Sequence, residues 1–218
     1  MTETIPKPMI PVRGRPFLEY EILLLKSHGI GDFVLCVGYL GEQIEDYFGD
    51  GKKLGVSIQY SRDGSNLLGP AGALKKAEQI LGESFFVTYG DAYLRVDYQR
   101  VMNSLLNSRK LGVMVVYENK NRYGKSDVVV RDEYVEQYNK KEQSEGMIWI
   151  NFGVTALKKK ALELIPDGRE CGEEAFYGEL IKRRELLAFS TSSRFYEIGN
   201  LNSLREFEEF ISVEKLSS

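Results

Sequence analysis

The stretch that decides the fold reads Phe85-Phe86-Val87-Thr88-Tyr89-Gly90-Asp91. Its first residues are apolar, aromatic and β-branched, which is typical of a buried strand, and the run ends abruptly at a glycine and an acid. In an open α/β sheet, ligands bind at the carboxyl ends of the strands. A carboxylate just past a strand, beside a glycine that allows close approach, is suited to a hard cation such as Mg²⁺. An ordinary Gly-Asp turn accounts for the same residues, and this stretch by itself favours the turn.

Length and composition describe a single globular domain over residues 1–218. Of the 218 residues, 43% are hydrophobic and 28% charged, which is enough for a hydrophobic core. The net charge of −3 gives no electrostatic reason to bind nucleic acid or an anionic membrane. No apolar run approaches the ~20 residues of a membrane span. The cysteines, Cys36 and Cys171, make no disulfide framework, so a cytoplasmic location is expected. Because His28 is the only histidine, the sequence argues against a histidine-based triad or zinc site.

Strands alternate with helices along the chain. Apolar runs predict strands over 33–38, 56–60, 85–89, 112–117, 148–155, 186–190 and 195–198. Helical periodicity and end signals predict helices over 16–26, 40–48, 71–81, 101–108, 158–164, 173–183 and 201–213. The segments 128–130 and 134–138 flank a polar triplet and predict a hairpin. The pattern therefore predicts an α/β fold with a doubly wound, mainly parallel sheet and an inserted β-hairpin.

Three further loop segments carry groups that suit chemistry. Lys7 stands between two prolines, a cation on a stiff loop suited to contacting phosphate, although a solvated surface lysine is the commoner case. The small-residue segment 67–74 leads into a helix, whose exposed N–H groups suit a base or phosphate; a plain helix start is an equal alternative. In segment 196–200, Glu197 repeats the arrangement of Asp91, an acid near a glycine after a strand. Two such carboxylates, brought together by the fold, would make a divalent-metal site.

Taken together, these motifs resemble the sugar-phosphate nucleotidyltransferases, or sugar-nucleotide pyrophosphorylases. Within that family the chain is similar to the short mannose- or heptose-1-phosphate guanylyltransferase-like and muramate-phosphate uridylyltransferase-like enzymes. The matching segments follow the family's order and span nearly the whole chain: IPKPMIPVRGRPFLEY (5–20), VGYLGEQIEDYFGDG (37–51), LLGPAGALKKAE (67–78), YGD (89–91), INFGV (150–154) and YEIGN (196–200). The resemblance implies a Rossmann-like nucleotidyltransferase fold.

The resemblance also implies a reaction. A sugar 1-phosphate attacks the α-phosphorus of a nucleoside triphosphate, and the products are a nucleotide-sugar and pyrophosphate. Catalysis would rest on positioning and charge neutralisation. By resemblance, Lys7 and Asp91 are catalytic, and Asp91 and Glu197 hold Mg²⁺. The residues implied in nucleotide binding are Leu68, Gly69, Ala71, Gly72 and Gly90. Those implied in sugar-phosphate binding are Tyr123, Gly124, Asn139, Lys140 and Asn151.

Two departures from the family pattern bear on activity. The family's second metal ligand is usually Asp, and the longer Glu197 shifts the ion. The family also begins earlier, with a strand and a glycine-rich signature, G-G-x-G-T-R-L, that wraps the triphosphate. We therefore expect a chain truncated at its N-terminus relative to the family, with its true start upstream of Met1 or a shortened gene product. Loss of the signature favours an inactive sugar-nucleotide-binding or regulatory module, whereas retention of Lys7 and both acids favours the enzyme.

The absent strand also predicts the behaviour of the isolated chain. In the family it lies between or beside the strands over 33–38 and 85–89, both of which have the pattern of buried strands. Without it, backbone N–H and C=O groups inside the sheet would stay unpaired, at ~1–3 kcal/mol each. We therefore expect poor solubility or self-association into a homo-oligomer through that edge, unless segment 5–12 moves in to pair there. The motifs do not select the base or the sugar.

Overall fold

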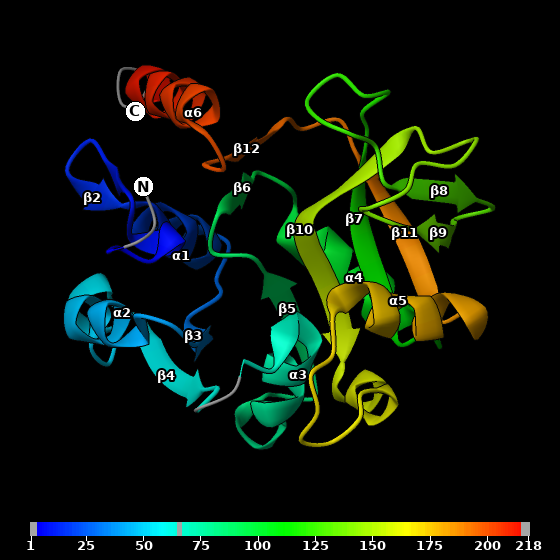
Figure 1. The fold of residues 1–218 in the computed structure, drawn as a ribbon, viewed down its shortest axis with the longest axis horizontal. Coiled ribbons are helices and arrows are strands. Elements are labelled where there is room, and N and C mark those ends of the chain that lie inside the picture. The colour runs from blue at the N-terminus through cyan, green and yellow to red at the C-terminus, as the bar shows by residue number, and fades with distance from the viewer. Residues whose placement is uncertain (1–3, 65–66, 215–218) are drawn as a thin grey trace.

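A computed structural model describes residues 4–64 and 67–214. Within these residues the largest sheet has six strands, in the order β5-β10-β7-β11-β9-β8 (Figure 1). The strands are β5 (Ser84–Thr88), β7 (Gly112–Glu118), β8 (Val128–Arg131), β9 (Tyr134–Tyr138), β10 (Trp149–Lys158) and β11 (Leu186–Thr191). The helices that pack on this sheet include α4 (Tyr98–Asn107) and α5 (Glu173–Lys182). The expected α/β fold is confirmed, and so is the hairpin, which β8 and β9 form.

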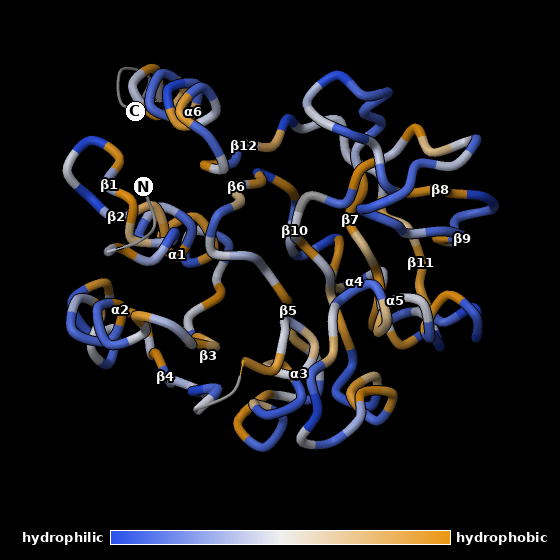
Figure 2. The backbone as a smooth tube through the Cα atoms, in the orientation of Figure 1, coloured by the Kyte–Doolittle hydropathy of each residue, from blue (hydrophilic) through white to orange (hydrophobic). Residues whose placement is uncertain are grey.

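Strand β7 shows how both faces of this sheet are covered. Alternate residues of a strand point to opposite faces. Val113 and Val115 lie in the hydrophobic cluster that includes α4, whereas Met114 and Val116 lie in the cluster that includes α5. All four are at most 1% exposed. In Figure 2 the hydrophobic residues concentrate along the strands, and the connecting loops are mostly hydrophilic. The apolar run of β7 is therefore that of a strand buried on both faces.

The directions of the strands are mixed. β10 runs antiparallel to both of its neighbours, β5 and β7, while β11 runs parallel to β7. The strands β5, β7 and β11 therefore point the same way, but the expectation of mainly parallel pairing is wrong, because β10 is inserted between β5 and β7. A run of apolar residues predicts a buried strand and carries no information on the direction of its neighbour. The β10–β7 ladder also shifts register between Asn151 and Thr155, where Gly153 has a φ of +84°.

A smaller unit lies beside β5 in Figure 1. It consists of α1 (Phe17–Ser27), α2 (Gly41–Phe48) and the parallel pair β3 (Asp32–Val37) and β4 (Ser57–Arg62). It has a hydrophobic core of its own, whose buried members are Leu18, Ile22, Val37, Ile44, Phe48, Val56 and Ile58. The two expected helices and two expected strands of this region are confirmed to within a residue or two, which is the usual uncertainty of element ends.

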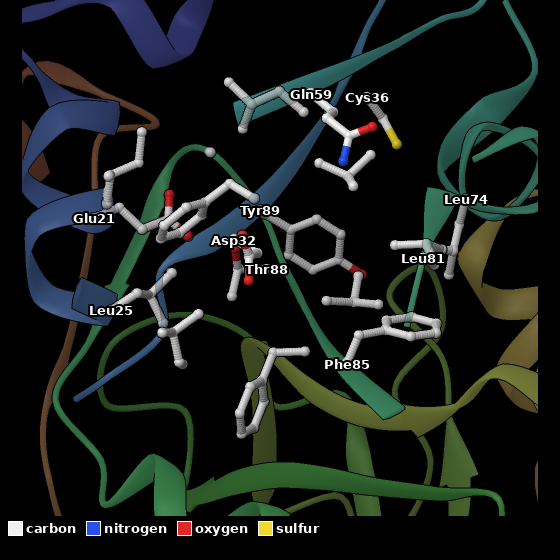
Figure 3. A pocket seen from close by; sticks show the side chains of 18 of the residues that line it. Glu21, Leu25, Asp32, Cys36, Gln59, Leu74, Leu81, Phe85, Thr88 and Tyr89 are labelled. Atoms are coloured by element: carbon white, nitrogen blue, oxygen red, sulfur yellow. The ribbon is translucent and has the colours of Figure 1, made fainter. Parts of the chain in front are cut away.

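A cavity of about 980 Å³ separates β3 from β5 (Figure 3). All residues of both strands line it. Among the described residues β3 pairs only with β4, and β5 only with β10, so each strand has one unpaired edge. The expected strand over 33–38 is confirmed as a strand, but the expectation that it is buried is wrong. Its central residues are half-buried, as is the whole of β5, whereas β7 is almost completely buried. The reason is the cavity.

The segment 5–12 does not pair with either open edge. Ile10 and Val12 are 5% and 0% exposed, in the cluster that also contains Phe17 and Phe207. The two-residue strand β1 (Pro11–Val12) pairs with β2 (Arg15–Pro16). Because its apolar side chains are used in this core, the segment does not supply the strand that β3 and β5 lack.

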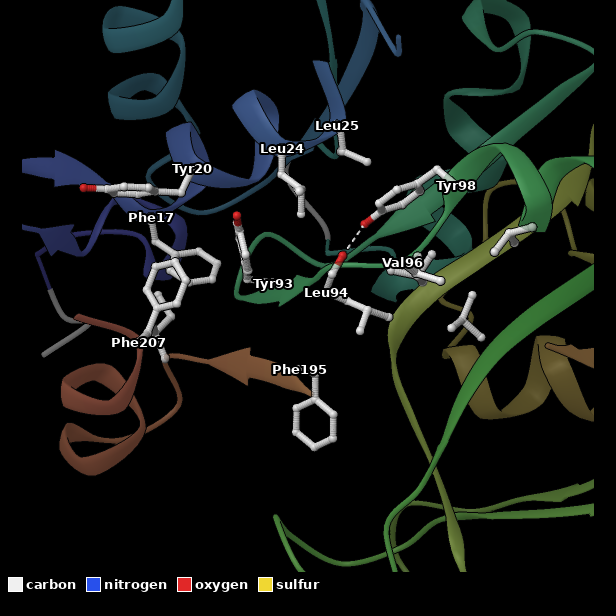
Figure 4. Close-up of a cluster of buried hydrophobic side chains, with 14 of the residues drawn as sticks. Phe17, Tyr20, Leu24, Leu25, Tyr93, Leu94, Val96, Tyr98, Phe195 and Phe207 are labelled. Atoms are coloured by element: carbon white, nitrogen blue, oxygen red, sulfur yellow. Dashed lines mark hydrogen bonds between the residues drawn. The ribbon is translucent and has the colours of Figure 1, made fainter. Parts of the chain in front are cut away.

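The C-terminal helix packs on α1 through aromatic rings. β12 (Phe195–Glu197) pairs antiparallel with β6 (Ala92–Leu94) and leads into α6 (Leu201–Glu214). The ring of Phe207 lies 4.8 Å from that of Phe17 and 5.1 Å from that of Tyr93 (Figure 4). The helix over 201–213 and the strand over 195–198 are confirmed. β6 was not expected, because three residues are too few for a periodic pattern.

Shorter elements complete the described chain. The helix expected over 71–81 is α3 (Gly69–Lys76), followed by a separate 3₁₀ turn. The helix expected over 158–164 is a 3₁₀ helix. The 3₁₀ segments are Lys7–Met9, Lys52–Leu54, Glu78–Ile80 and Lys159–Leu164. Every helix among the described residues is too short or too polar to cross a lipid bilayer.

Candidate functional site

Lys7 and Asp91 form an ion pair at the carboxyl end of β5. Nζ of Lys7 lies 2.5 Å from Oδ2 of Asp91, and the two side chains are 36% and 34% exposed. Gly90 makes this pair geometrically feasible, since a Cβ at that position would lie only 2.9 Å from Cγ of Pro8. The sequence suggests that Gly90 allows a ligand to approach closely. In the structure, the space that Gly90 leaves is used by the loop that carries Lys7.

Glu197 lies on the segment next to Asp91. In the pairing of β12 with β6, Glu197 stands opposite Ala92. The N–H of Ile198 donates to the backbone carbonyl of Asp91 over 3.3 Å. The carboxylate of Glu197 accepts a hydrogen bond from the N–H of Gly199 over 2.5 Å. The fold thus brings the two acids onto neighbouring segments, with the Glu197 carboxylate bonded to its own loop.

The donor atoms at this edge fit Mg²⁺. Asp91 and Glu197 offer only carboxylate oxygens, which Mg²⁺ prefers, and Mg²⁺ commonly takes one or two protein carboxylates together with water and substrate phosphates. The position beside Asp91 already accepts a positive charge, that of Lys7. Among the described residues there is no group of three or more His, Cys, Asp or Glu side chains that could hold a metal ion. A metal here would therefore depend on the substrate for the rest of its ligands.

A second lysine approaches Asp91 from another segment. Nζ of Lys140 lies 5.1 Å from the ring centroid of Tyr89, which precedes Asp91 by two residues. Burial lowers the pKa of Lys140, and the carboxylates of Asp127 and Asp91 oppose that shift. Lys7 and Lys140 therefore bring two cationic side chains to the carboxyl end of β5.

Three acids around Lys140 were not identified from the sequence: Asp127, Glu173 and Glu174. Lys140 forms an ion pair with Glu173, and its N–H donates to Oε1 of Glu174 over 2.9 Å. Burial raises the pKa of Asp127 to about 6 and that of Glu173 to about 7. Buried acids with perturbed pKa values mark candidate functional sites. In the sequence, Glu173 and Glu174 show only as a pair of acids in the first turn of a helix, which the helix dipole already explains, and Asp127 follows no local pattern.

Asn151 is held against this cluster by β10. Its N–H donates to Oδ1 of Asp127 over 2.9 Å, and its own Oδ1 accepts from the N–H of Gly153 over 3.1 Å. Oε2 of Glu173 is buried without a hydrogen-bond partner among the described residues, and the side chain of Asn151 hydrogen-bonds to Tyr138. Buried polar atoms are normally satisfied, so the Glu173 oxygen marks a place that a polar ligand would complete.

The other residues implied in sugar-phosphate binding are engaged in their own loops. Oδ1 of Asn139 accepts from two backbone N–H groups of the turn that follows it. The ring of Tyr123 packs 5.8 Å from that of Phe195. The carbonyl of Gly124 accepts from Nδ2 of Asn119 over 2.8 Å. These contacts explain the local structure, and the binding role of these residues stays a prediction.

The N-terminus of α3 is occupied by the protein itself. The N–H groups of Ala71 and Gly72 both donate to the carbonyl of Cys171, over 3.1 and 3.2 Å. A Cβ at Gly69 would lie 2.7 Å from the same oxygen, and one at Gly72 would lie 2.9 Å from the carbonyl of Arg169. The glycines therefore allow the loop before α5 to pack on α3. The expectation that these amide groups are exposed is wrong for Ala71 and Gly72.

The start of this segment nevertheless borders the cavity. The N–H of Leu68 donates to Oδ2 of Asp63 over 3.3 Å. Asp63, Gly69 and Gly90 line the cavity between β3 and β5. Binding of a base here would use side chains and the cavity wall more than the amides of α3, and the nucleotide-binding role of this segment stays a prediction.

Known proteins resemble the chain over most of its length. A family model described as nucleotidyl transferase matches residues 1–213. The chain is 31% identical over 196 residues to a D-glycero-alpha-D-manno-heptose 1-phosphate guanylyltransferase of Campylobacter jejuni, covering 89% of this chain and 86% of that protein. It is also 31% identical over 189 residues to a UTP–glucose-1-phosphate uridylyltransferase of Synechocystis sp., covering 78% of this chain and only 48% of the relative's length.

A solved structure is similar over nearly the whole chain. It is that of HddC from Yersinia pseudotuberculosis complexed with GMP-PN. The two structures share a TM-score of 0.78 at 26% sequence identity, covering 95% of this chain and 90% of that one.

Proposed function

Because this chain belongs to the nucleotidyl transferase family, we propose that it transfers a nucleotidyl group from a nucleoside triphosphate to a sugar 1-phosphate. A phosphate oxygen of the sugar 1-phosphate bonds to the α-phosphorus, and the bond from that phosphorus to the departing pyrophosphate breaks. The products are a nucleotide-sugar and pyrophosphate. The observation that carries the proposal is the gathering of Lys7, Asp91 and Lys140 at the carboxyl end of β5.

Lys7 and Lys140 would counter the main difficulty of this reaction, which is the repulsion between negatively charged phosphate groups. Both substrates are polyanions, and charge accumulates further on the departing pyrophosphate. Lys7 would exchange its contact with Asp91 for a phosphate oxygen of the triphosphate, and Lys140 would hold the phosphate of the sugar. Preorganised cations aimed at developing charge are commonly the largest contribution to such catalysis. Asp91 and Glu197 would hold Mg²⁺, which when bound supplies further neutralisation of phosphate charge.

The cluster around Lys140 suits a sugar. Among the described residues, Oε2 of Glu173 is a buried acceptor without a hydrogen-bond partner. A sugar hydroxyl group can donate a hydrogen bond, so it would satisfy this oxygen. Asp127, which accepts from the N–H of Asn151, would keep the amide in position.

We further propose that the nucleotide is GTP and the sugar a mannose or heptose 1-phosphate. Support comes from the Campylobacter jejuni guanylyltransferase, which matches most of both chains, and from the solved relative complexed with GMP-PN. A uridylyltransferase is equally identical to the chain, so the base requires a direct test.

The test is pyrophosphate release with a panel of nucleoside triphosphates and sugar 1-phosphates, in the presence of Mg²⁺. We expect release with at least one pair and the highest kcat/KM with GTP. Asp91→Asn should lower kcat/KM at least about 100-fold, the size of effect seen when a charge-stabilising group is removed. Asp46→Asn, at an exposed position of α2, is the matched control and should keep full activity. Full activity of the Asp91→Asn variant would overturn the assignment of the site.

An inactive sugar-nucleotide-binding module is the second candidate. It is favoured by the direct contact of Lys7 with Asp91, in which each group already satisfies the other. Calorimetry separates the two candidates. A working site should bind the triphosphate at least ten-fold more tightly than the monophosphate, a difference of about 1.4 kcal/mol. Equal, weak binding of both nucleotides without turnover would favour the module.

A further inference from the structure

Two segments that carry candidate site residues are joined by one arginine. Loop 119–126 follows β7, whose carboxyl end lies at the same edge of the sheet as that of β5, because the two strands point the same way. The segment between β11 and β12 passes this loop in Figure 1 and carries Arg194. The guanidinium carbon of Arg194 lies 4.5 Å from the ring centroid of Tyr123, in the loop, and 4.8 Å from that of Tyr196, in β12. Arg194 therefore contacts two rings from distant parts of the chain.

Further contacts extend from both rings. The guanidinium carbon of Arg122 lies 5.1 Å from the ring centroid of Tyr123. The ring of Phe210, in α6, stacks on that of Tyr196, with the centroids 4.3 Å apart and an interplanar angle of 20°. The planar guanidinium group is attracted to the face of an aromatic ring. Loop 119–126, β12 and α6 are thus connected through a chain of contacts between cations and rings.

Hydrogen bonding does not explain why Arg194 is placed there. It forms an ion pair with Glu206, an exposed residue of α6. Its Nε, however, is buried and has no hydrogen-bond partner within the part of the chain that the structure describes. A buried N–H without a partner costs stability, so an arginine that served only stability would not be expected to keep one. Departures of this kind from a fully satisfied structure are typical of functional sites.

β12 connects Arg194 with both acids of the candidate site. Glu197 follows Arg194 by three residues, and these three residues form β12. β12 pairs with β6 over its whole length, and Glu197 stands opposite Ala92, which directly follows Asp91. Since ladder hydrogen bonds fix the register of paired strands, the two strands hold Arg194 in a fixed position relative to both acids.

Loop 119–126 is held together by its own hydrogen bonds. The side chain of Asn119 donates to the carbonyl of Gly124 over 2.8 Å and accepts from the N–H of Tyr123 over 3.0 Å. The start of the loop is tied to the segment before β10, because the N–H of Asn119 donates to the carbonyl of Ile148 over 2.9 Å. At the tip, the ring of Tyr123 makes the contact with the β12 segment. The position of the tip relative to β12 therefore depends on this ring contact.

We propose that Arg194 is a positioning residue for nucleotidyl transfer, because it holds the tip of loop 119–126 at a fixed distance from the two acids. This inference rests on the proposed function and on the predicted role of Tyr123 and Gly124 in sugar-phosphate binding. A sugar phosphate held by the loop would then keep its place relative to the nucleotide. Because a displacement of about 1 Å can slow a reaction about 100-fold, a residue that touches neither substrate can still affect the reaction.

Two variants of Arg194 and one control test this proposal. Arg194→Met keeps a long side chain but removes the planar cation. It should raise KM for the sugar 1-phosphate at least about ten-fold, leave KM for the triphosphate unchanged and lower Tm only slightly. Arg194→Lys keeps the charge and can still pair with Glu206, but it has no planar group to place against the rings, so it should restore Tm and keep most of the rise in KM. Arg205→Met, at an exposed position of α6, is the matched control and should behave as the parent does.

Amide hydrogen exchange tests the hold on the loop without any substrate. In Arg194→Met, exchange over residues 119–126 should become at least about ten-fold faster, while exchange over β9 stays unchanged. Arg205→Met should leave both regions unchanged.

Three results would overturn the proposal. The first is an equal rise in KM for both substrates, or no rise, in Arg194→Met. The second is unchanged exchange over residues 119–126 in the same variant. The third is complete recovery of KM in Arg194→Lys, which would assign the effect to charge alone. If the parent protein releases no pyrophosphate with any substrate pair, the proposed function fails, and hydrogen exchange still decides whether Arg194 holds the loop.

Discussion

Replacing Glu21 with Gln should stabilise the protein by an amount that grows with pH. Burial raises the pKa of Glu21 to about 8, and the hydrogen bond with Thr88 opposes the shift. In the unfolded chain the same carboxyl ionises near its ordinary pKa of 4.5. Between these values the folded state holds a proton that the unfolded state has lost. Each pH unit therefore lowers the free energy of unfolding by about 1.4 kcal/mol, a loss of about 3 kcal/mol at pH 7 that levels off at about 5 kcal/mol above pH 8.

Gln has nearly the same shape and can still bond Thr88, but it does not ionise. Urea denaturation of both proteins at pH 5, 6, 7 and 8 measures the difference. We expect it to be under about 1 kcal/mol at pH 5 and about 3 kcal/mol in favour of Gln at pH 7. Glu83→Gln, at an exposed position, is the control and should follow the parent protein at every pH. A difference between Glu21→Gln and the parent that stays constant from pH 5 to pH 8 would refute the reasoning, because Glu21 would then ionise normally in the folded state.

Three further predictions concern the site. Gly90→Ala should push away the loop that carries Lys7, because the new Cβ would lie 2.9 Å from Pro8. As a result kcat/KM should fall at least about ten-fold, while Tm falls little. Lys140→Met should raise KM for the sugar 1-phosphate about ten-fold or more and leave KM for the triphosphate unchanged, as steady-state kinetics would measure. KM for the sugar 1-phosphate should rise from pH 6 to pH 8, because Glu173 loses its proton near pH 7 and its carboxylate then competes with the sugar phosphate for Lys140. Glu173→Gln should flatten that rise. A profile that is flat in the parent would contradict this role for Glu173.

The sequence by itself determined the order and nature of nearly all the elements. Apolar runs such as 112–117 and helical periodicity such as that of 201–213 are local signals, because the pattern of neighbouring residues decides which face is buried. The hairpin was predictable for the same reason. Lys7, Asp91 and Glu197 could be predicted as site residues because each follows a local rule, a cation between prolines or an acid near a glycine after a strand, and their roles stay predictions.

Only the tertiary structure decided which of these groups meet and what they contact. Asp127 and Glu173 have no distinguishing local pattern, and they become a cluster only because β10, the hairpin and α5 converge on Lys140. The amide groups at the start of α3 could not be known to be occupied, since their acceptor, Cys171, is far away in sequence. The burial of β3 and β5 was misjudged for the same physical reason. An apolar run shows that a strand suits a buried position, but its actual burial depends on the neighbours that the fold places against it, and here both strands face a cavity.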